Sequence, residues 1–278
     1  MVLQSALHHL ASGPRYTSAA VASTRIRCLS TKGAPEVTLY QYAICPFCNI
    51  TKSFMSFADL KYKAVEVNPL TKAEISKWSE YKKVPIAMVD GEQVNGSDEI
   101  VSKLINHPFI ASSLQEKLDA TMTTVTFAES EGSKKWEQFA RDDLASLLYP
   151  NICRTWSDSY EAFSYVKDVE SFSSFQKFAI QNVGSLAMYY AASKIKQKRN
   201  ITDERQALND ALVQLEEEGL GEGKQFLSGK DKPNLGDVAV FGTLRSIEGL
   251  PTHDEVMQGR EQTALVDWYQ RMKPLISY

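Results

Sequence analysis

The chain contains few of the residues that hold disulfide-rich and metal-binding proteins together. Four cysteines and four histidines occur among its 278 residues, and four cysteines are too few to cross-link a chain of this length. Apart from Cys45 and Cys48, the cysteines are Cys28 and Cys153. A structural zinc site, the alternative interpretation of the Cys45 and Cys48 pair, lacks a second pair of ligands at suitable spacing. We therefore predict no metal site and a reducing compartment.

Long apolar runs and an excess of charge are absent as well. No stretch approaches the roughly 18 consecutive apolar residues that a membrane-spanning helix requires. A net charge of −3 gives no electrostatic reason to bind nucleic acid. We expect no nucleic-acid partner and at most peripheral contact with a membrane. What remains is an ordinary globular balance of 43% hydrophobic and 23% charged residues, in a chain long enough for two domains.

Acidic residues are missing from the first part of the chain, residues 1–35, which instead contain Arg15, Arg25, Arg27 and Lys32 among many Ser, Thr and Ala. This composition is typical of an organellar presequence. Arg27 stands two residues before the bond that follows Leu29, as at mitochondrial cut sites, so we predict mitochondrial import first and plastid import second. The alternative interpretation is a disordered basic tail.

The most informative motif is Cys45-Pro46-Phe47-Cys48, which lies between two segments of different periodicity. The run from Val37 to Tyr42 is typical of a strand, and residues 49–60 place apolar side chains at helical spacing. Cys45 is therefore expected at a helix N-terminus, where backbone N–H groups and the helix dipole lower a thiol pKa from about 8.5 to roughly 3.5–7.5. We predict that Cys45 is the reactive sulfur and that Cys48, one turn later, is shielded.

The elements that follow indicate a thioredoxin-like domain over residues 36–107. We expect a second strand at 62–67, a helix through Ile75 and Trp78, a third strand at 83–89 and a return strand that includes Val94. An Asp-Gly turn at 90–91 joins the last two strands.

Two features of this domain point to a ligand. Pro85 opens the third strand, which suggests a cis bond after Val84 that leaves backbone groups free to pair with a ligand. Ser97 and Asp98 precede a helix through Ile105, where either residue can cap the exposed N–H groups. The helix start can also bind the charged groups of a ligand, and a plain cap is the alternative interpretation.

Residues 108–278 predict an all-α domain. Apolar faces recur at helical spacing, namely at Trp136, Phe139, Ala140, Leu144, Leu147 and Leu148, at Leu208, Ala211, Leu212 and Leu215, and at Leu265, Trp268, Met272 and Leu275. Asn234 and Asp237 fit a capping box at the start of another helix. A long apolar stretch, 172–198, ends in a basic cluster of Lys194, Lys196, Lys198 and Arg199. This cluster is expected at a helix C-terminus, with contact to a membrane surface as the alternative.

Three of these motifs resemble the glutathione-binding thioredoxin-fold families, the glutaredoxins and glutathione transferases. Residues 45–48 are similar to the glutaredoxin active site, Val84 and Pro85 to the edge that pairs with the glutathione backbone, and 96–98 to the loop that holds its γ-glutamyl end. The resemblance implies a glutaredoxin-like domain followed by a glutathione-transferase-like helical domain.

A longer set of motifs resembles one family within that superfamily, the prostaglandin E synthases of type 2. These motifs are Leu39 to Cys48, Val65 to Pro69, Tyr81 to Ile86, Tyr149 to Asn151 with Arg154-Thr155, and Lys232 to Gly242. The resemblance implies a homodimer that binds glutathione, with haem ligated through the glutathione sulfur. It implies Cys45, Tyr42 and Cys48 as catalytic residues and Pro46, Phe47, Val84, Pro85, Ser97 and Asp98 as the glutathione site. The family has Asp where this chain has Gly96, so the ammonium contact is expected to pass to Asp98.

Three classes of function remain open. The resemblance implies an isomerase that converts the endoperoxide prostaglandin H2 to prostaglandin E2 through Cys45. The residues alone favour a glutathione-dependent thiol-disulfide oxidoreductase or glutathione transferase, in which Cys45 attacks a mixed disulfide and glutathione resolves it. The third class is a haem and glutathione binding protein, although the sequence offers few histidines as ligands.

Overall fold

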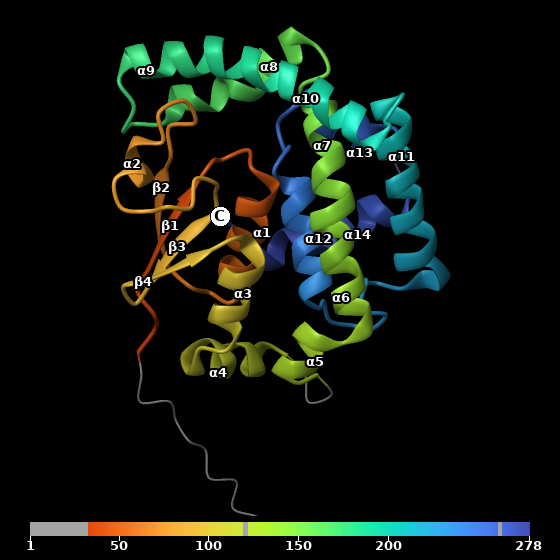
Figure 1. The fold of residues 1–278 in the computed structure, drawn as a ribbon. Coiled ribbons are helices and arrows are strands. Elements are labelled where there is room, and N and C mark those ends of the chain that lie inside the picture. The colour runs from red at the N-terminus through yellow and green to blue at the C-terminus, as the bar shows by residue number, and fades with distance from the viewer. Residues whose placement is uncertain (1–32, 119–121, 261–262) are drawn as a thin grey trace, which may run out of the picture. The chain divides into compact units, whose positions relative to one another are not determined.

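The computed structural model describes residues 33–118, 122–260 and 263–278, which belong to one compact unit (Figure 1). The predicted presequence, 1–35, lies almost wholly outside the described residues. The boundary at residues 107 and 108 stays a prediction from the sequence.

The first part of this unit is built on a four-stranded mixed sheet. The strands are β1 (Val37–Gln41), β2 (Lys63–Glu66), β3 (Ile86–Val89) and β4 (Glu92–Asn95), in the order β2-β1-β3-β4. Strand β1 runs parallel to β2 and antiparallel to β3. Helices α1 (Pro46–Phe57) and α3 (Ser97–Ile105) lie on one side of the sheet, and α2 (Ala73–Ser76) lies on the other (Figure 1). The predicted thioredoxin-like arrangement is confirmed.

All elements that the structure describes after α3 are helical, as predicted. The α-helices are α4 (Pro108–Lys117), α5 (Thr124–Glu129), α6 (Glu131–Gln138), α7 (Ala145–Ile152), α8 (Trp156–Ala162), α9 (Ser174–Ala179), α10 (Ser185–Arg199), α11 (Glu204–Gln214), α12 (Leu235–Arg245), α13 (Pro251–Gln258) and α14 (Ala264–Met272). Three π-helical turns (Phe139–Leu144, Ile180–Gly184 and Leu215–Gly219) join α6 to α7 and α9 to α10 and extend α11. Short 3₁₀ turns occupy Phe163–Asp168, Gly221–Gly223 and Lys273–Leu275. None of the helices in the described ranges is both long and apolar enough to cross a bilayer.

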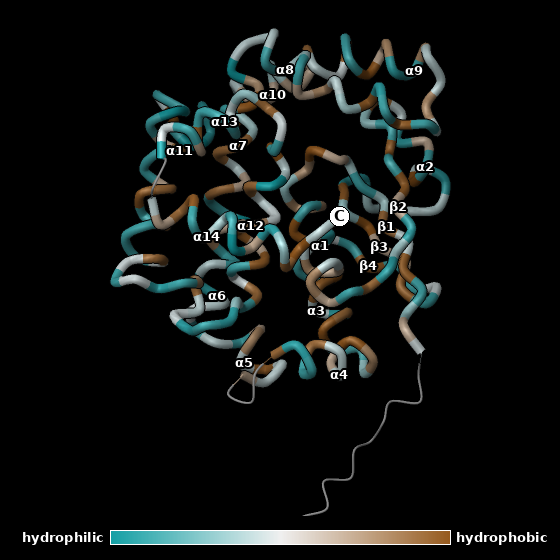
Figure 2. Tube along the Cα trace, turned by 180° about the vertical axis from the view of Figure 1, so that it is seen from behind, coloured by the Kyte–Doolittle hydropathy of each residue, from teal (hydrophilic) through white to brown (hydrophobic). Residues whose placement is uncertain are grey.

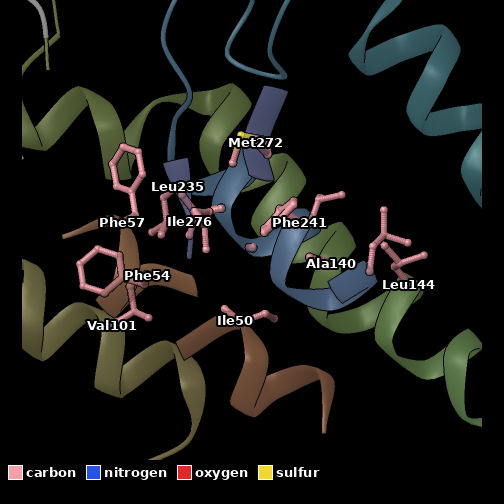
Figure 3. Close-up of a cluster of buried hydrophobic side chains, with 14 of the residues drawn as sticks. Ile50, Phe54, Phe57, Val101, Ala140, Leu144, Leu235, Phe241, Met272 and Ile276 are labelled. Atoms are coloured by element: carbon pink, nitrogen blue, oxygen red, sulfur yellow. The ribbon is translucent and has the colours of Figure 1, made fainter. Parts of the chain in front are cut away.

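The main core forms where α12 crosses α1 (Figure 3). A Cβ atom at Gly242 of α12 would lie 2.6 Å from the carbonyl oxygen of Asn49 on α1, so only glycine permits this approach. Phe54 of α1 and Phe241 of α12 are completely buried there. Burying such a side chain stabilises the fold by about 1.5–3 kcal/mol, so this crossing holds α1, and with it the Cys45 motif, firmly in place.

The start of α12 confirms the predicted capping box. The Asn234 side chain accepts a hydrogen bond from the Asp237 amide, and the Asp237 carboxylate accepts one from the Asn234 amide. The same carboxylate also accepts hydrogen bonds from the Leu227 amide at 2.7 Å and from Nε1 of Trp268 at 2.8 Å. Asp237 is fully buried, and burial raises the pKa of its carboxyl to about 6.

Two predictions about local structure were wrong. Helix α2 ends at Ser76, short of Trp78, whose ring is 41% exposed and packs on Tyr40 with centroids 4.9 Å apart. The last helix, α14, ends before Leu275, which lies in a 3₁₀ turn and is 40% exposed. Helical spacing alone does not reveal where a helix stops, because both segments continue their apolar period past the true end.

Candidate functional site

Cys45 occupies the N-cap position of α1, as predicted. Its backbone is extended, with φ −78° and ψ 121°, Pro46 follows at the first helical position, and no side chain caps the helix. The Cys45 amide donates to the carbonyl oxygen of Tyr42 at 3.1 Å, which turns the chain from the end of β1 into the helix. The thiol therefore lies where a capping oxygen is normally found, within the positive field of the helix start.

The two thiols of the motif differ in acidity in the predicted direction. A hydrogen bond from the Cys48 thiol lowers the pKa of Cys45, and the backbone N–H groups of Cys48 and Phe47 add to this effect against the opposing effect of burial. Burial raises the pKa of the Cys48 thiol well above its ordinary value, and its hydrogen bond to Cys45 raises it further. Cys45 is thus the more acidic thiol of the pair, and Cys48 donates a hydrogen bond to it.

Tyr149 contacts the reactive sulfur and was missed by the sequence analysis as a site residue. It lies on α7, and its hydroxyl donates to Sγ of Cys45 at 4.0 Å, across 104 positions in the sequence. This hydrogen bond lowers the pKa of Cys45, whereas burial raises the pKa of the Tyr149 hydroxyl well above its ordinary value. The tyrosine therefore keeps its proton while it stabilises the thiolate.

Two polar side chains, the buried Asn49 and the half-buried Glu66, hold the turn before Cys45, and neither was predicted. Asn49, one turn into α1, donates through Nδ2 to the carbonyl oxygens of Ala43 at 2.7 Å and Cys45 at 2.9 Å. Glu66, at the end of β2, accepts a hydrogen bond from the Ala43 amide at 2.8 Å. Ala43 is thus fixed through both of its backbone groups, which orients the Cys45 thiol. A polar residue at an otherwise apolar helix position was the one signal for Asn49 in the sequence.

A cavity of about 240 Å³ lies beside Cys45. Its walls come from the turn before α1, from the loop between β2 and α2 and from the helical part of the chain, and they are largely apolar. The lining includes Tyr42, Ile44, Cys45, Pro69, Leu70, Tyr149, Ile152, Cys153, Phe163, Tyr165, Gly184, Ala187, Met188 and Ile195. Such a cavity favours an apolar ligand with few polar groups.

The predicted catalytic residue Tyr42 and the predicted ligand residues Phe47 and Val84 lie close to the thiols. Cys45, Cys48 and Val84 are buried in one apolar cluster against which Tyr42 and Phe47 pack. Burial raises the pKa of the Tyr42 hydroxyl far above its ordinary value, so this side chain does not ionise. Tyr42 also lines the cavity, whereas Phe47 and Val84 are not among its lining residues.

Val84 and Pro85, the predicted edge for glutathione, lie just before β3, whose first residue, Ile86, pairs with Asn95 at the end of β4. The bond between Val84 and Pro85 is cis, as predicted, and both residues are buried. The Gly96 amide donates to the carbonyl oxygen of Pro85 at 3.0 Å, which brings the start of α3 to this edge. Val84 and Pro85 precede the paired segment of β3, which begins at Ile86.

The prediction that Ser97 or Asp98 caps α3 was wrong. Gly96 occupies the N-cap position, and no side chain caps the helix. Gly96 has φ 87° and ψ 151°, a conformation essentially restricted to glycine. Ser97 and Asp98 are instead the first two helical residues, Ser97 buried and Asp98 exposed. The helix start is therefore left without an acceptor from the chain's own side chains.

Neither described histidine belongs to this site. His107 caps α4, where its side chain accepts a hydrogen bond from the Phe109 amide, and His253 packs on the ring of Tyr269. Within residues 33–118, 122–260 and 263–278, no group of three or more His, Cys, Asp or Glu side chains could hold a metal ion. Cys153 is buried, and burial raises the pKa of its thiol, which fits a packing role.

A sheet of this order, a helical second part and a cysteine at the start of the first helix form a thioredoxin-like domain joined to a helical one, and a match to a glutathione S-transferase domain places the chain in the glutathione-transferase-like superfamily. The N-terminal domain family of glutathione S-transferases matches residues 39–109. A glutathione transferase from Phanerochaete chrysosporium superposes with a TM-score of 0.56 at 14% identity, over 88% of this chain and 99% of that one. A human theta-class glutathione transferase, solved with the glutathione conjugate of 1-menaphthyl sulfate, gives a TM-score of 0.52 at 12% identity, over 87% and 82% of the two chains.

Closer relatives define the family. The chain is 35% identical to prostaglandin E synthase 2 of Danio rerio, over 86% of this chain and 70% of the relative. It is 31% identical to prostaglandin E synthase 2 of Mus musculus, over 87% of this chain and 70% of the relative. The chain belongs to the prostaglandin E synthase 2 family, and the resemblance inferred from its motifs is confirmed.

Proposed function

We propose that this protein is an isomerase that converts prostaglandin H2 to prostaglandin E2. One observation carries this proposal: a cysteine of lowered pKa at an uncapped helix start borders a largely apolar cavity. A thiolate in apolar surroundings is suited to attack a weak, uncharged bond in a lipid. The name of the relatives gives the product, prostaglandin E, and the family resemblance gives the substrate, the bicyclic endoperoxide prostaglandin H2.

The reaction uses no external oxidant or reductant. The Cys45 thiolate attacks one oxygen of the O–O bond, so that an S–O bond forms and the other oxygen leaves as an alkoxide that takes up a proton. The Tyr149 hydroxyl, which contacts the sulfur and lines the same cavity, donates the proton in that step. Loss of a proton from the carbon that bears the S–O oxygen then forms the ketone and expels the thiolate. One proton is gained and one is lost, and the thiolate is regenerated.

We propose glutathione as the molecule bound at the edge formed by Val84, Pro85 and the start of α3. The free N–H groups of α3 suit a carboxylate, and Ser97 and Asp98 stand at this start to hold the γ-glutamyl end. Asp98 is exposed and supplies the negative charge for an ammonium group. The absence of a side-chain cap is what makes this start fit for a ligand.

Haem ligated through the glutathione sulfur stays a prediction from the family resemblance. No histidine lines the cavity in the described part of the chain. A haem iron bound directly by Cys45 would occupy the sulfur that the isomerase reaction needs. No step of the proposed reaction therefore uses haem.

A glutathione-dependent thiol-disulfide oxidoreductase is the second candidate. It is favoured by the hydrogen bond between the Cys48 and Cys45 thiols, since a second thiol in contact with the first can displace a mixed disulfide. In that reaction Cys45 attacks the disulfide, one sulfur leaves as a thiol, and glutathione or Cys48 releases the other. The isomerase reaction makes no use of Cys48 as a nucleophile.

The two candidates are separated by assaying endoperoxide conversion and mixed-disulfide reduction side by side, with and without glutathione. Cys45→Ser should abolish whichever of the two activities the protein has. Cys153→Ser, which changes another thiol of the same cavity, should retain that activity. Conversion of the endoperoxide at a rate independent of Cys45 would reject the isomerase, and reduction of mixed disulfides alone would establish the second candidate.

We also propose, from the family resemblance and composition, that the protein is a homodimer in a mitochondrion or, second, a plastid. A fluorescent reporter fused to residues 1–35 should enter the organelle, because import receptors and an inside-negative potential act on a basic, acid-free segment. The mature chain should then begin near Ser30. A diffuse cytosolic reporter would leave a basic tail in place of a presequence, and sedimentation of the purified protein tests the dimer.

A further inference from the structure

Helices α9 and α10 expose an apolar face that no described part of the chain covers. Together with the π-helical turn between them they form one helix, Ser174–Arg199, which runs along the top of Figure 1 on the side opposite α4 and α5. Its exposed apolar side chains are Phe175 (78%), Phe178 (66%), Val183 (56%), Leu186 (44%) and Tyr190 (60%). They recur at intervals of three to five residues and so follow one side of the helix.

The opposite side of this helix is already packed. Ala192 is buried against the helical core, and a Cβ atom at Gly184 would lie 3.2 Å from the ring of Phe163. Gly184 also lines the cavity beside Cys45. Figure 2 shows that hydrophobic positions recur along α9. The inner side of the helix is already packed against the core, so the exposed apolar stripe on its outer side indicates a binding surface.

The charge of the helix identifies the partner. Residues 174–199 contain five basic residues, Lys177, Lys194, Lys196, Lys198 and Arg199, and no acidic residue, whereas the whole chain has a net charge of −3. Lys194 and Lys198 are exposed at the end of the apolar stripe. Lys196 is paired with Glu204, while Arg199 and Lys177 donate to the backbone carbonyl oxygens of Asp142 and Lys167 and keep their charge without a carboxylate partner. An apolar stripe that ends in a basic cluster, on a helix without a carboxylate, complements an anionic lipid surface.

A second copy of the same helix is a poorer match. Because the helix has no acidic residue, two copies packed along this face would bring like charges together without a carboxylate on either helix to pair with them. We propose that the helix Ser174–Arg199 docks on an anionic bilayer. It lies in the plane of the interface, with its phenylalanines and leucine in the acyl boundary and its lysines among the headgroups. This surface goes beyond the proposed function, because docking needs no activity.

The test is cosedimentation of the full chain with vesicles of phosphatidylcholine, alone or with phosphatidylserine. The protein should bind the anionic vesicles, and added salt should weaken the binding. Phe175→Ser with Phe178→Ser, and separately Lys194→Glu with Lys198→Glu, should each lower the partition coefficient by roughly tenfold or more. All four side chains are exposed, and the two lysines lie near the helix end. Thermal unfolding checks that the variants fold.

Matched controls change the same chemistry elsewhere. Val125→Ser removes an exposed apolar side chain from α5, and Lys230→Glu with Lys232→Glu reverses two exposed charges before α12. Both should leave binding within about twofold of wild type, since neither touches the helix. Arg25→Glu with Arg27→Glu tests the basic N-terminal residues in the same way.

Three results would overturn the proposal. The first is no binding to anionic vesicles. The second is binding that survives both helix variants or is lost only when Arg25 and Arg27 are changed. The third is a dimer in solution that Phe175→Ser with Phe178→Ser converts to a monomer, because the apolar face would then belong to a second copy of the chain.

Discussion

Helices α1 and α12 cross in the core, but their N-termini are built in opposite ways. At the start of α12, Asn234 and Asp237 satisfy the exposed N–H groups, and the Asp237 carboxylate also binds Leu227 and Trp268. At the start of α1 no side chain caps the helix, and a cysteine stands in the N-cap position. The N–H groups at a helix start are used for stability in α12, where side chains pair with them, and for chemistry in α1, where they favour a thiolate.

The comparison implies that a functional helix start needs support from outside itself. The turn before α1 is held by Asn49 and Glu66, and its sulfur is held by Cys48 and Tyr149. The start of α12 needs no such arrangement, because its own residues close the hydrogen bonds. Substitutions at the two starts should therefore have separable effects on activity and on stability.

Cys45→Ser should have the largest effect. A serine hydroxyl does not ionise near neutral pH, so the nucleophile is lost and activity should fall roughly a thousandfold or more. The melting temperature should change little, because serine is close to isosteric and can itself cap α1. Steady-state kinetics and thermal unfolding of the same preparation provide the check, and an active serine variant would show that another group carries the reaction.

Asp237→Ala should invert this pattern. It removes a cap and leaves the Leu227 amide and the Trp268 indole without their shared acceptor, so the free energy of unfolding should fall by about 3 kcal/mol. Activity per folded molecule should stay near that of wild type. Denaturant unfolding measures the first quantity. If stability held and turnover dropped, Asp237 would have to be placed in the site.

The same carboxyl predicts a pH dependence of stability. Burial raises its folded pKa to about 6, above the ordinary value of 3.8. The protonated form therefore contributes stability that is fully present below pH 3.8 and is lost as the pH rises through about 6. Wild type should lose stability relative to Asp237→Asn across this window, as followed by unfolding at each pH. A constant difference between the two proteins would contradict the raised pKa.

Cys48→Ala and Cys48→Ser should differ from each other. Alanine removes the hydrogen bond that contributes most to the lowered pKa of Cys45, whereas serine still offers a donor. Alanine should raise the Cys45 titration midpoint, and serine should keep much of the activity. If both variants lost activity as fully as Cys45→Ser, a dithiol mechanism would be favoured over the isomerase.

Tyr149→Phe should give the smallest shift, since its hydroxyl lies 4.0 Å from the sulfur. We expect the Cys45 midpoint to rise less than in Cys48→Ala and turnover to fall several-fold, because a weaker, longer hydrogen bond to a thiolate is lost. Tyr42→Phe is the comparison from the same cavity, and it tests separately the catalytic role that the family resemblance implies for Tyr42. Equal effects from both tyrosines would point to general packing of the cavity.

Local patterns in the sequence predicted much of this structure. The strand, the Cys-Pro break and the helical spacing after it placed Cys45 correctly, and the Asn234 and Asp237 pair predicted the α12 cap. Tyr149 could not be predicted as a partner of Cys45, because 104 residues separate them and only the packing of α7 brings them together. At α3 the prediction of a side-chain cap was wrong, since a glycine with positive φ took the N-cap position.

The central claim is that the uncapped start of α1 holds Cys45 as a thiolate near neutral pH. The most direct measurement is the rate of alkylation of each cysteine in the full chain as a function of pH, mapped by mass spectrometry. The midpoint for Cys45 should lie below about pH 7.5, whereas Cys48 and Cys153, whose pKa values are raised by burial, should react only at higher pH. A Cys45 midpoint at or above about pH 8.5, that of an ordinary thiol, would contradict the account.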